Sequence, residues 1–511
     1  MNSSSLKKDL KSLFRPHFII IYLLIVAAYF ASRLINLTSI PVFADEGIYI
    51  RWAQVMRSEP TLRFLPLSDG KQPLFMWLVI PFLKLISDPL FAGRITSVFA
   101  GFGTLLGLSS LIWYITRSKQ AVVIGGLFYI ITPYSLFFDR MALADSLLAM
   151  FAVWSVFIGI LFIQHPRLDL AMILGFVLGG GLITKSPGLL FVLLQSTLLL
   201  TVTKRQKSHF LKIIAGWTIA GLIAFAIYNV LRLGPNFHMI GARNQDYIFT
   251  FSEVVKHPLN PLTGNLKSTL NWLALLLTWP LFSLLLFSTF SKKHSHYIHT
   301  FILWILIPII FQGLIAKVYT PRYLLFIVPV IIVTITLLLS NIQISVKKPI
   351  HLFLFFLLIT FPLAKSFQIL TNPAHAQLPE RMRSGYFREW TAGYGIKEIA
   401  QYLTERSKDR TVVVGTEGYF GTLPDGLQIY TEGNPNITVI GTGQPVTKTP
   451  ESLLNSLEEH EVYLVVNSTR NLLTPIELTH LEPIAQYQKL ESSTGEVEYL
   501  EFFRLHPIAV R

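Results

Sequence analysis

The chain has 511 residues, of which 52% are hydrophobic and only 14% charged, and its mean hydropathy is +0.52. These values exclude an ordinary soluble globular or disordered chain and indicate an integral membrane protein. The chain has 43 Lys and Arg against 29 Asp and Glu, an excess typical of loops held at the anionic cytoplasmic leaflet, so we expect no nucleic-acid partner. The chain contains no Cys, which excludes thiolate catalysis and Cys-ligated metals.

The first apolar segment runs from about Phe18 to Leu34 and follows a basic N-terminal stretch. It lacks a small-residue cleavage site, so we interpret it as a retained signal anchor with a cytoplasmic N-terminus. A spanning helix needs about 20 apolar residues, and the sequence on that basis predicts eleven spans, at 18–35, 91–116, 121–138, 146–164, 168–184, 187–203, 210–232, 268–290, 298–316, 321–341 and 350–367.

The stretch 73–86 is also apolar but is too short to cross a bilayer comfortably, so we expect an interfacial or re-entrant helix at the outer face. With the N-terminus inside, the short cytoplasmic loops all carry Lys or Arg, as the positive-inside rule requires: 116–120, 164–169, 204–209, 291–299 and 345–349. The sequence therefore predicts a multi-pass protein of the cell (plasma) membrane whose C-terminal part lies outside the cytoplasm.

From about Trp390 the composition changes, because this part has 9 basic and 16 acidic residues whereas residues 1–389 have 34 and 13. The spacing of apolar residues predicts helices at 395–407 and 449–460 and buried strands at 411–417 and 461–468. We therefore expect a polytopic α-helical transmembrane domain over 1–389 and a soluble, extracytoplasmic α/β domain over 390–511. This tail carries no nucleophile elbow, zinc pattern or phosphate loop, so we interpret it as an accessory module.

The predicted outer face collects ionisable residues of both signs, several of them at the ends of spans, where such groups are costly unless they pair or face water. They are Asp45, Glu46, Arg51, Lys71, Arg94, Asp139, Arg140, Asp145, Lys185, Lys317 and Arg322. A carboxylate can act as general base on an acceptor hydroxyl, and Lys and Arg can stabilise the charge that grows on a phosphate leaving group. A lipid-phosphate substrate, with its head at the membrane surface, fits this combination.

The order of several motifs resembles the GT-C glycosyltransferases, and more narrowly the bacterial relatives of protein O-mannosyltransferases and aminoarabinose lipid A transferases (families 39 and 83). The motifs are the Asp-Glu pair at 45–46, KQPLFMWL at 71–78, AGRITSVFAGFGTLLGL at 92–108, DRMALAD at 139–145, GLITKSPG at 181–188 and YTPRYLLFIVP at 319–329. The resemblance implies the GT-C fold, a polyprenyl-phosphate-linked sugar donor, transfer with inversion, a glycan, lipid or protein acceptor, and no nucleotide cofactor.

The resemblance also implies roles near the first loop. Asp45 would be the catalytic carboxylate, and Glu46 would help to bind or orient the acceptor. Lys71 would reach the donor phosphate, although Gln72 replaces the first proline of the family's segment. Arg94 would have a supporting role.

In the later motifs, Arg140 could bind phosphate, and Asp145 could ligate a divalent ion or orient Arg140, so the need for a metal stays open. Around Lys185 and Arg322, the Thr-Lys-x-Pro and Tyr-Thr-Pro-Arg-Tyr contexts, the second of which contains Tyr319, favour phosphate recognition over snorkelling to lipid headgroups. For Lys317, snorkelling is the better interpretation.

Simpler interpretations exist for several of these features. Asp45 and Glu46 could lie in a solvated loop or at a helix N-cap, and Asp145 could cap the helix that follows it. The loop 234–267 could be a mobile cover, with His238, Arg243 and Asp246 as candidate contacts, or an ordered interfacial helix. The protein could also be a transporter or flippase of lipid-linked saccharides, or a non-catalytic cell-envelope assembly protein. The sugar and the acceptor stay open.

Overall fold

A computed structural model describes residues 16–202, 207–340, 349–492 and 494–507. The chain forms two compact units, of which the first comprises 1–36, 63–75 and 95–379 and the second 37–62, 76–94 and 380–511. The second unit thus groups the acidic tail with two segments of the predicted first external loop. The predicted domain boundary at residue 390 stays a prediction.

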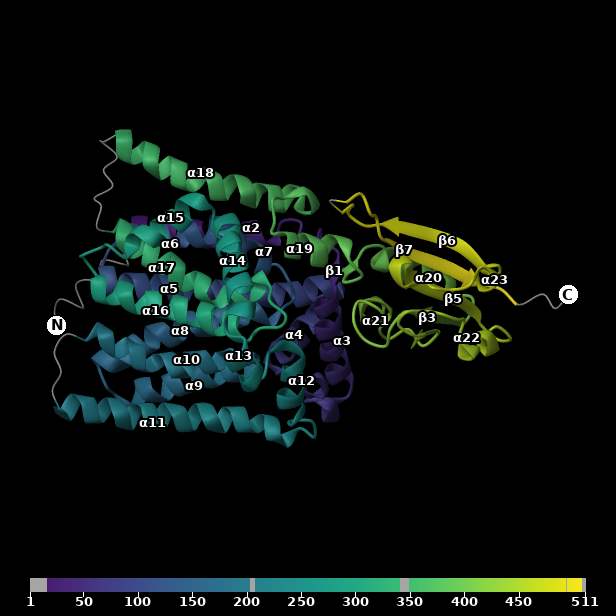
Figure 1. Ribbon diagram of the computed structural model, residues 1–511, viewed down its shortest axis with the longest axis horizontal. Helices are drawn as coiled ribbons and strands as arrows, with labels where there is room; N and C mark the ends of the chain where they lie inside the picture. The colour runs from purple at the N-terminus through teal and green to yellow at the C-terminus, as the bar shows by residue number, and fades with distance from the viewer. Residues whose placement is uncertain (1–15, 203–206, 341–348, 493, 508–511) are drawn as a thin grey trace. The chain divides into compact units, whose positions relative to one another are not determined.

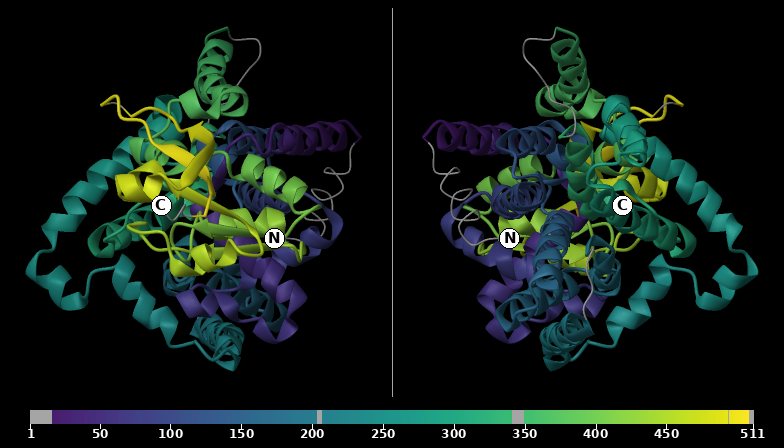
Figure 2. Two further views of the ribbon diagram at one scale, coloured as in Figure 1. Left: turned by 90° about the vertical axis from the view of Figure 1, so that its right-hand side faces the viewer. Right: turned by 90° about the vertical axis from the view of Figure 1, so that its left-hand side faces the viewer.

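The first unit is built from helices. Several of them, among them α8, α9, α10 (Gly188–Leu194) and α11, lie lengthwise beside one another in Figure 1, and α11 is seen nearly end-on in Figure 2. The longer helices of this unit are α2 (Pro16–Leu34), α5 (Pro89–Thr116, whose first turn belongs to the second unit), α6 (Lys119–Ile131), α8 (Ala144–Gln164), α9 (Leu168–Thr184), α11 (Lys207–Asn229), α14 (Leu259–Leu276), α15 (Trp279–Ser288), α16 (Ser295–Ile315), α17 (Val328–Leu339) and α18 (Pro349–Thr371).

Every predicted span coincides with an apolar helical segment in the structure. Among the described residues, six segments are long and apolar enough to cross a membrane: 16–34, 89–116, 144–164, 208–233, 295–315 and 321–339. The pair α14 and α15 forms a seventh candidate, bent by 116°, and the other four predicted spans fall on shorter apolar helices. The prediction of a multi-pass membrane protein is confirmed, whereas the count of eleven spans stays a prediction.

Close helix packing explains the three consecutive glycines of α9. A Cβ on Gly179 would approach Ile227 of α11 to within 2.6 Å, and one on Gly180 would approach Phe151 of α8 to within 2.4 Å. Because α11 and α8 contact different glycines, the segment is a helix-packing site. Large apolar side chains such as Leu222 and Phe225 of α11 are left exposed, as expected for a surface that faces lipid.

The second unit contains a five-stranded sheet with the order β4-β3-β5-β7-β6. β3 (Val412–Thr416) pairs in parallel with β4 (Ile437–Gly441) and β5 (Glu461–Asn467), and β7 (Tyr499–Leu505) adds antiparallel to β5 and β6 (Leu481–Gln488). The helices α20 (Ile396–Arg406), α21 (Asp425–Thr431) and α22 (Glu451–Ser456) accompany it. The predicted helices and strands of the tail are thus confirmed, while β4, β6, β7 and α21 were not predicted.

The helix α3 (Ala44–Ser58), which begins with the Asp-Glu motif, packs against α21 within the second unit. A Cβ on Gly47 would lie 3.1 Å from the backbone of Gly426, and the Gln54 side-chain amide donates to the Ile429 carbonyl at 2.9 Å. Just before α3, the short strand β1 (Val42–Phe43) pairs with β2 (Ala392–Gly393). The tail therefore supports the segment that carries Asp45.

The stretch 73–86, predicted to be interfacial or re-entrant, forms the short helix α4 (Leu74–Leu85).

Candidate functional site

Asp45 and Glu46 occupy the first turn of α3, directly after the extended residue Phe43. The free N–H groups of a first turn favour negative charge, so a carboxylate is stabilised there. Asp45 is half-buried, whereas Glu46 is completely buried and one of its oxygens accepts a hydrogen bond from the Phe43 N–H at 3.0 Å. The two neighbouring carboxylates therefore have different environments.

The partner of Glu46 is Arg94, whose side chain is also fully buried. Arg94 Nε donates to Glu46 Oε1 at 2.8 Å, and its NH2 donates to Oε2 at 2.7 Å. The same guanidinium donates to the carbonyls of Leu37, Ile40 and Pro41. One arginine thus ties the start of α5 to the start of α3 and to the loop that leads into it.

This pairing places Glu46 inside the protein, and its predicted role in binding the acceptor stays a prediction. Both oxygens of Glu46 accept hydrogen bonds inside the protein, and the side chain has no exposed surface. Glu46 therefore positions the first turn of α3, and so Asp45, from within. The geometry of Arg94 agrees with the supporting role expected for it.

In the first unit, Lys185 and Asp145 form an ion pair at 2.6 Å. Asp145 lies in the first turn of α8, and Lys185 follows the last residue of α9. Burial lowers the pKa of Lys185, and the charge of Asp145 opposes this shift, whereas the nearby cations Arg322 and Lys71 add to it. Asp145 thus pairs with Lys185, and its predicted orientation of Arg140 stays a prediction.

Lys71, Lys185 and Arg322 together form what we call the cationic cluster. The Tyr323 ring lies between two of them, 4.6 Å from Lys185 Nζ and 5.4 Å from the Arg322 guanidinium carbon. On the third side, Gln72 donates to the Ser186 hydroxyl at 3.0 Å and so holds the Lys71 segment beside the Lys185 segment. The predicted phosphate-binding residues from three distant motifs thus come together.

A tight turn presents Lys71 to this cluster. Gly70 has a φ of +68°, a left-handed conformation that glycine adopts without strain, and its N–H closes the turn on Leu67. A Cβ on Gly70 would also come within 2.8 Å of Arg243. Lys71 then contacts Tyr247, with Nζ 3.2 Å from the hydroxyl and 4.4 Å from the ring centre.

Arg140 has a different environment from the cationic cluster. Its guanidinium donates to the carbonyls of Ser32, Ile35 and Asn36, at the C-terminal end of α2. These carbonyls lack partners within the helix, so a cation that binds them stabilises the helix end. The hydrogen bonds give Arg140 a structural role at this helix end, and its predicted binding of phosphate stays a prediction.

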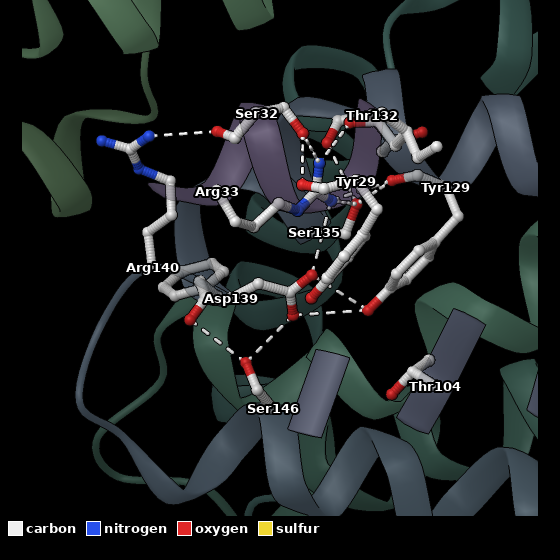
Figure 3. Close-up of polar contacts among 12 residues, drawn as sticks. Tyr29, Ser32, Arg33, Thr104, Tyr129, Thr132, Ser135, Asp139, Arg140 and Ser146 are labelled. Atoms are coloured by element: carbon white, nitrogen blue, oxygen red, sulfur yellow. Dashed lines mark hydrogen bonds and ion pairs between the residues drawn. The ribbon is translucent and has the colours of Figure 1, made fainter. Parts of the chain in front are cut away.

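The neighbouring Asp139 belongs to a buried polar network. Figure 3 shows its carboxylate pointing toward Tyr129 and Arg33, whereas the Arg140 side chain extends the other way toward Ser32. Asp139 accepts hydrogen bonds from the Tyr129 hydroxyl at 3.0 Å and from Ser146 at 3.1 Å, and it pairs with Arg33 at 3.4 Å. Arg33 also donates to the Ile130 and Tyr129 carbonyls. The network links α2, α6 and α8 and pairs the buried carboxylate with a buried guanidinium.

Tyr319 and Lys317 lie just before the Arg322 turn. The Tyr319 hydroxyl is 2.7 Å from that of Thr269 in α14, and burial raises the pKa of Tyr319 to about 12. Tyr319 is thus engaged inside the unit, and its predicted contact with substrate stays a prediction. Lys317 Nζ donates to the Gln245 carbonyl at 3.0 Å and takes no part in the cationic cluster.

The long loop 234–267 contains two short helices, α12 (Met239–Tyr247) and α13 (Phe251–Lys256), which agrees with the ordered alternative. Arg243 pairs with Asp69 at 2.7 Å and with Asp246 at 2.6 Å. These contacts and Tyr247 hold the loop against the Lys71 turn. Tyr247 and Tyr323 contact the cationic cluster but were not predicted to do so: Tyr323 belongs to the Tyr-Thr-Pro-Arg-Tyr motif, but no motif marks Tyr247.

A metal site was left open, with Asp145 as its candidate ligand. Over the described ranges, no group of three or more His, Asp and Glu side chains is arranged to hold an ion. The carboxylate of Asp145 is paired with Lys185, so no ligand set surrounds it.

Comparisons with known proteins relate this geometry to a family. Residues 70–231 match the family model described as dolichyl-phosphate-mannose-protein mannosyltransferase. No curated protein sequence matches the chain significantly. The matched region contains Lys71, Arg94, Asp145 and Lys185.

The fold is similar to that of solved membrane enzymes. The crystal structure of ArnT from Cupriavidus metallidurans bound to undecaprenyl phosphate has a TM-score of 0.58 at 12% identity, covering 94% of this chain and 97% of that one. Its apo state has a TM-score of 0.57, also at 12% identity and with the same two coverages. The Archaeoglobus fulgidus oligosaccharyltransferase tethered with an acceptor peptide has a TM-score of 0.51 at 12% identity, covering 96% and 74%. The predicted resemblance is confirmed: residues 70–231 match the dolichyl-phosphate-mannose-protein mannosyltransferase family model, and the chain has the fold of ArnT.

Proposed function

We propose that the protein is a glycosyltransferase that moves a sugar from a polyprenyl-phosphate donor to a hydroxyl or phosphate acceptor, with inversion, at the external face of the membrane. The observation that carries the proposal is the cationic cluster of Lys71, Lys185 and Arg322, gathered from three distant motifs. The undecaprenyl phosphate bound by ArnT, which has the same fold, supports a donor of this class.

The cluster suits a phosphate electrostatically. Three cations gather here, with Asp145 beside Lys185 and with an Asp69 oxygen 3.9 Å from Lys71 Nζ. When the bond between the sugar and the phosphate breaks, negative charge grows on the phosphate oxygen, and fixed cations stabilise that charge most where water is excluded. Asp145 favours the protonated, charged form of the buried Lys185, which would otherwise tend to lose its proton.

For a hydroxyl acceptor, Asp45 serves as the general base. It takes the proton of the acceptor hydroxyl while that oxygen bonds to the anomeric carbon, and the bond from this carbon to the phosphate oxygen breaks. Attack from the side opposite the leaving phosphate inverts the anomeric configuration. The products are the glycosylated acceptor, polyprenyl phosphate and a protonated Asp45. The Arg94–Glu46 pair holds the first turn of α3 for this step.

A direct test is to incubate the purified protein in nanodiscs with undecaprenyl-phosphate-linked sugars and a cell-envelope extract. We expect release of free undecaprenyl phosphate, detected by mass spectrometry, only in the presence of the extract. Consumption of a nucleotide sugar, with the lipid-linked sugars left intact, would contradict the proposal.

The external placement follows from the basic residues of the short loops, of which 204–206 and 345–348 lie outside the described residues. Because the chain contains no Cys, single cysteines can report the orientation. We expect Thr61→Cys to react with a membrane-impermeant maleimide on intact cells and Lys292→Cys to react only after permeabilisation. The opposite pattern would overturn the orientation.

A further inference from the structure

The second unit contains a pocket of about 180 Å³ that the catalytic scheme does not use. One wall is the segment 38–42, which leads into α3, and the other walls come from Leu90 and from the tail. The tail residues that line it are Gly393, Tyr394, Gly395, Lys397, Glu398 and Tyr430. Such a volume is below the about 300–1,000 Å³ of pockets for drug-sized ligands, so it suits a group the size of one sugar ring.

The pocket is continuous with the support of the acidic pair. Arg94, which holds Glu46, also binds the carbonyls of Ile40 and Pro41, and both residues line the pocket. The adjoining strand β1 pairs with β2, so the pocket wall is fixed from both sides. A ligand in this pocket therefore contacts the segment that ends only three residues before Asp45.

Several polar groups of the lining are available to a ligand. In the part of the chain that the structure describes, the hydroxyls of Tyr394 and Tyr430 and the carboxylate of Glu398 have no hydrogen-bond partner in the protein. Lys397, in contrast, pairs with Asp88 at 2.6 Å. The pocket thus offers hydroxyl and carboxylate groups beside two tyrosine rings, a combination that can bind both the hydroxyls and the apolar C–H face of a sugar.

The charges around the pocket decide between neutral and anionic ligands. Lys397 pairs with Asp88 and Arg94 pairs with Glu46, so these four charges cancel, and Glu398 leaves a sum of −1 (2 − 3). A phosphate or carboxylate ligand would face unbalanced negative charge, whereas a neutral sugar would find acceptors for its hydroxyl protons. The pocket therefore favours a neutral ligand, whereas the cationic cluster favours an anionic one.

We propose that this pocket binds one neutral sugar ring of a glycan acceptor, an inference that rests on the proposed transferase function. The acceptor is then recognised by a ring held in the second unit, next to the segment that carries the general base. Tyr394, Tyr430 and Glu398 are the specificity-determining residues.

The proposal can be tested with methyl mannopyranoside, methyl glucopyranoside and methyl galactopyranoside as probes. Saturation-transfer NMR on the full-length protein in nanodiscs measures their dissociation constants. We expect at least one probe to bind, and the loss of one hydrogen bond in Tyr430→Phe or Glu398→Gln to weaken it about fivefold. Glu405→Gln is the matched control, because Glu405 lies on the same helix and is exposed to solvent. The corresponding hexose 6-phosphate should bind more weakly than the neutral probe.

The outcomes separate this proposal from the transferase function. Retained sugar binding in Asp45→Asn, together with loss of transfer, supports both. Equal binding in all variants, or tighter binding of the hexose 6-phosphate, overturns the pocket assignment even if the enzyme transfers sugar normally. Binding that depends on Tyr430 in a protein with no transferase activity overturns the acceptor role and the proposed function together, and leaves only a sugar-binding pocket.

Discussion

Arg94 and Glu46 form a fully buried ion pair with two hydrogen bonds, of 2.8 Å and 2.7 Å, although they are 48 residues apart in the chain. Glu46, one member of the pair, lies in the first turn of α3 next to Asp45. Two charges that are removed from water are stable only while each satisfies the other. The position of the proposed base therefore depends on a residue at the start of α5.

Arg94→Met should destabilise the protein strongly, because it leaves Glu46 buried without its partner. Loss of one member of a buried pair costs about 3–5 kcal/mol, so we expect a clearly lower midpoint of thermal unfolding in detergent. The unfolding midpoint of Arg94→Lys should lie between those of the wild type and Arg94→Met, since an ammonium cannot reproduce the two parallel hydrogen bonds of the guanidinium to the carboxylate. The double variant Arg94→Met with Glu46→Leu should recover part of the loss. Single variants as stable as the wild type would contradict the assigned role of the pair.

Lys185→Gln should weaken the binding of undecaprenyl phosphate. A hydrogen bond to a charged group contributes about 1.5–3 kcal/mol, so the dissociation constant measured in nanodiscs should rise about 10- to 100-fold. Lys317→Gln is the control, because Lys317 binds the Gln245 carbonyl outside the cationic cluster, and its dissociation constant should stay within about twofold of the wild type. Equal effects of the two substitutions would argue against the cluster as a phosphate site.

Gly101→Ala should disrupt the buried network around Asp139. The added Cβ would lie 2.3 Å from the Tyr29 hydroxyl oxygen and 2.6 Å from the carboxyl carbon of Asp139, so these side chains would have to move. Gly221→Ala in α11 is the control, because nothing lies within 4 Å of a Cβ added at Gly221. The better helix propensity of Ala should raise the free energy of unfolding of this variant by up to about 1 kcal/mol. The unfolding midpoint should therefore fall for the first variant and not for the second. A similar change in both would show that the network tolerates the extra methyl group.

Asp425 should make the stability of the second unit depend on pH. Burial raises the pKa of Asp425 to about 6, and the Gly421 N–H and the nearby Arg51 oppose this shift. Between about pH 4 and pH 6 the folded chain keeps a proton that the unfolded chain has lost, so stability falls as the pH rises, by up to about 3 kcal/mol. Asp425→Asn should remove this fall, measured as the unfolding midpoint against pH. The exposed Asp409→Asn should leave it in place, and an unchanged profile in Asp425→Asn would contradict the assignment.

The elements of the fold were largely predictable, because hydrophobic length and periodicity are local properties of the sequence. The eleven apolar segments and the strands β3 and β5 illustrate this. The grouping of 37–62 and 76–94 with the tail was not predictable, because it depends on contacts between distant segments such as α3 and α21. The strands β6 and β7 were missed because polar residues interrupt their apolar pattern.

The site was predictable only in part. Motifs identified Lys71, Lys185 and Arg322, which the structure brings together. The partners of other charged residues could not be inferred from motifs: Arg140 binds carbonyls at the end of α2, and Glu46 pairs with Arg94. A sequence shows that a charge is present near a span end, but the group that satisfies that charge is set by the tertiary structure.

The central claim is that Asp45 is the general base of sugar transfer. The most direct measurement is mass spectrometry of glycans and lipids from cells that carry wild-type protein or Asp45→Asn at equal levels and with equal unfolding midpoints. We expect one glycan to lose a sugar in the variant, while the corresponding polyprenyl-phosphate sugar accumulates. Identical glycans and lipids in the two strains would contradict the claim.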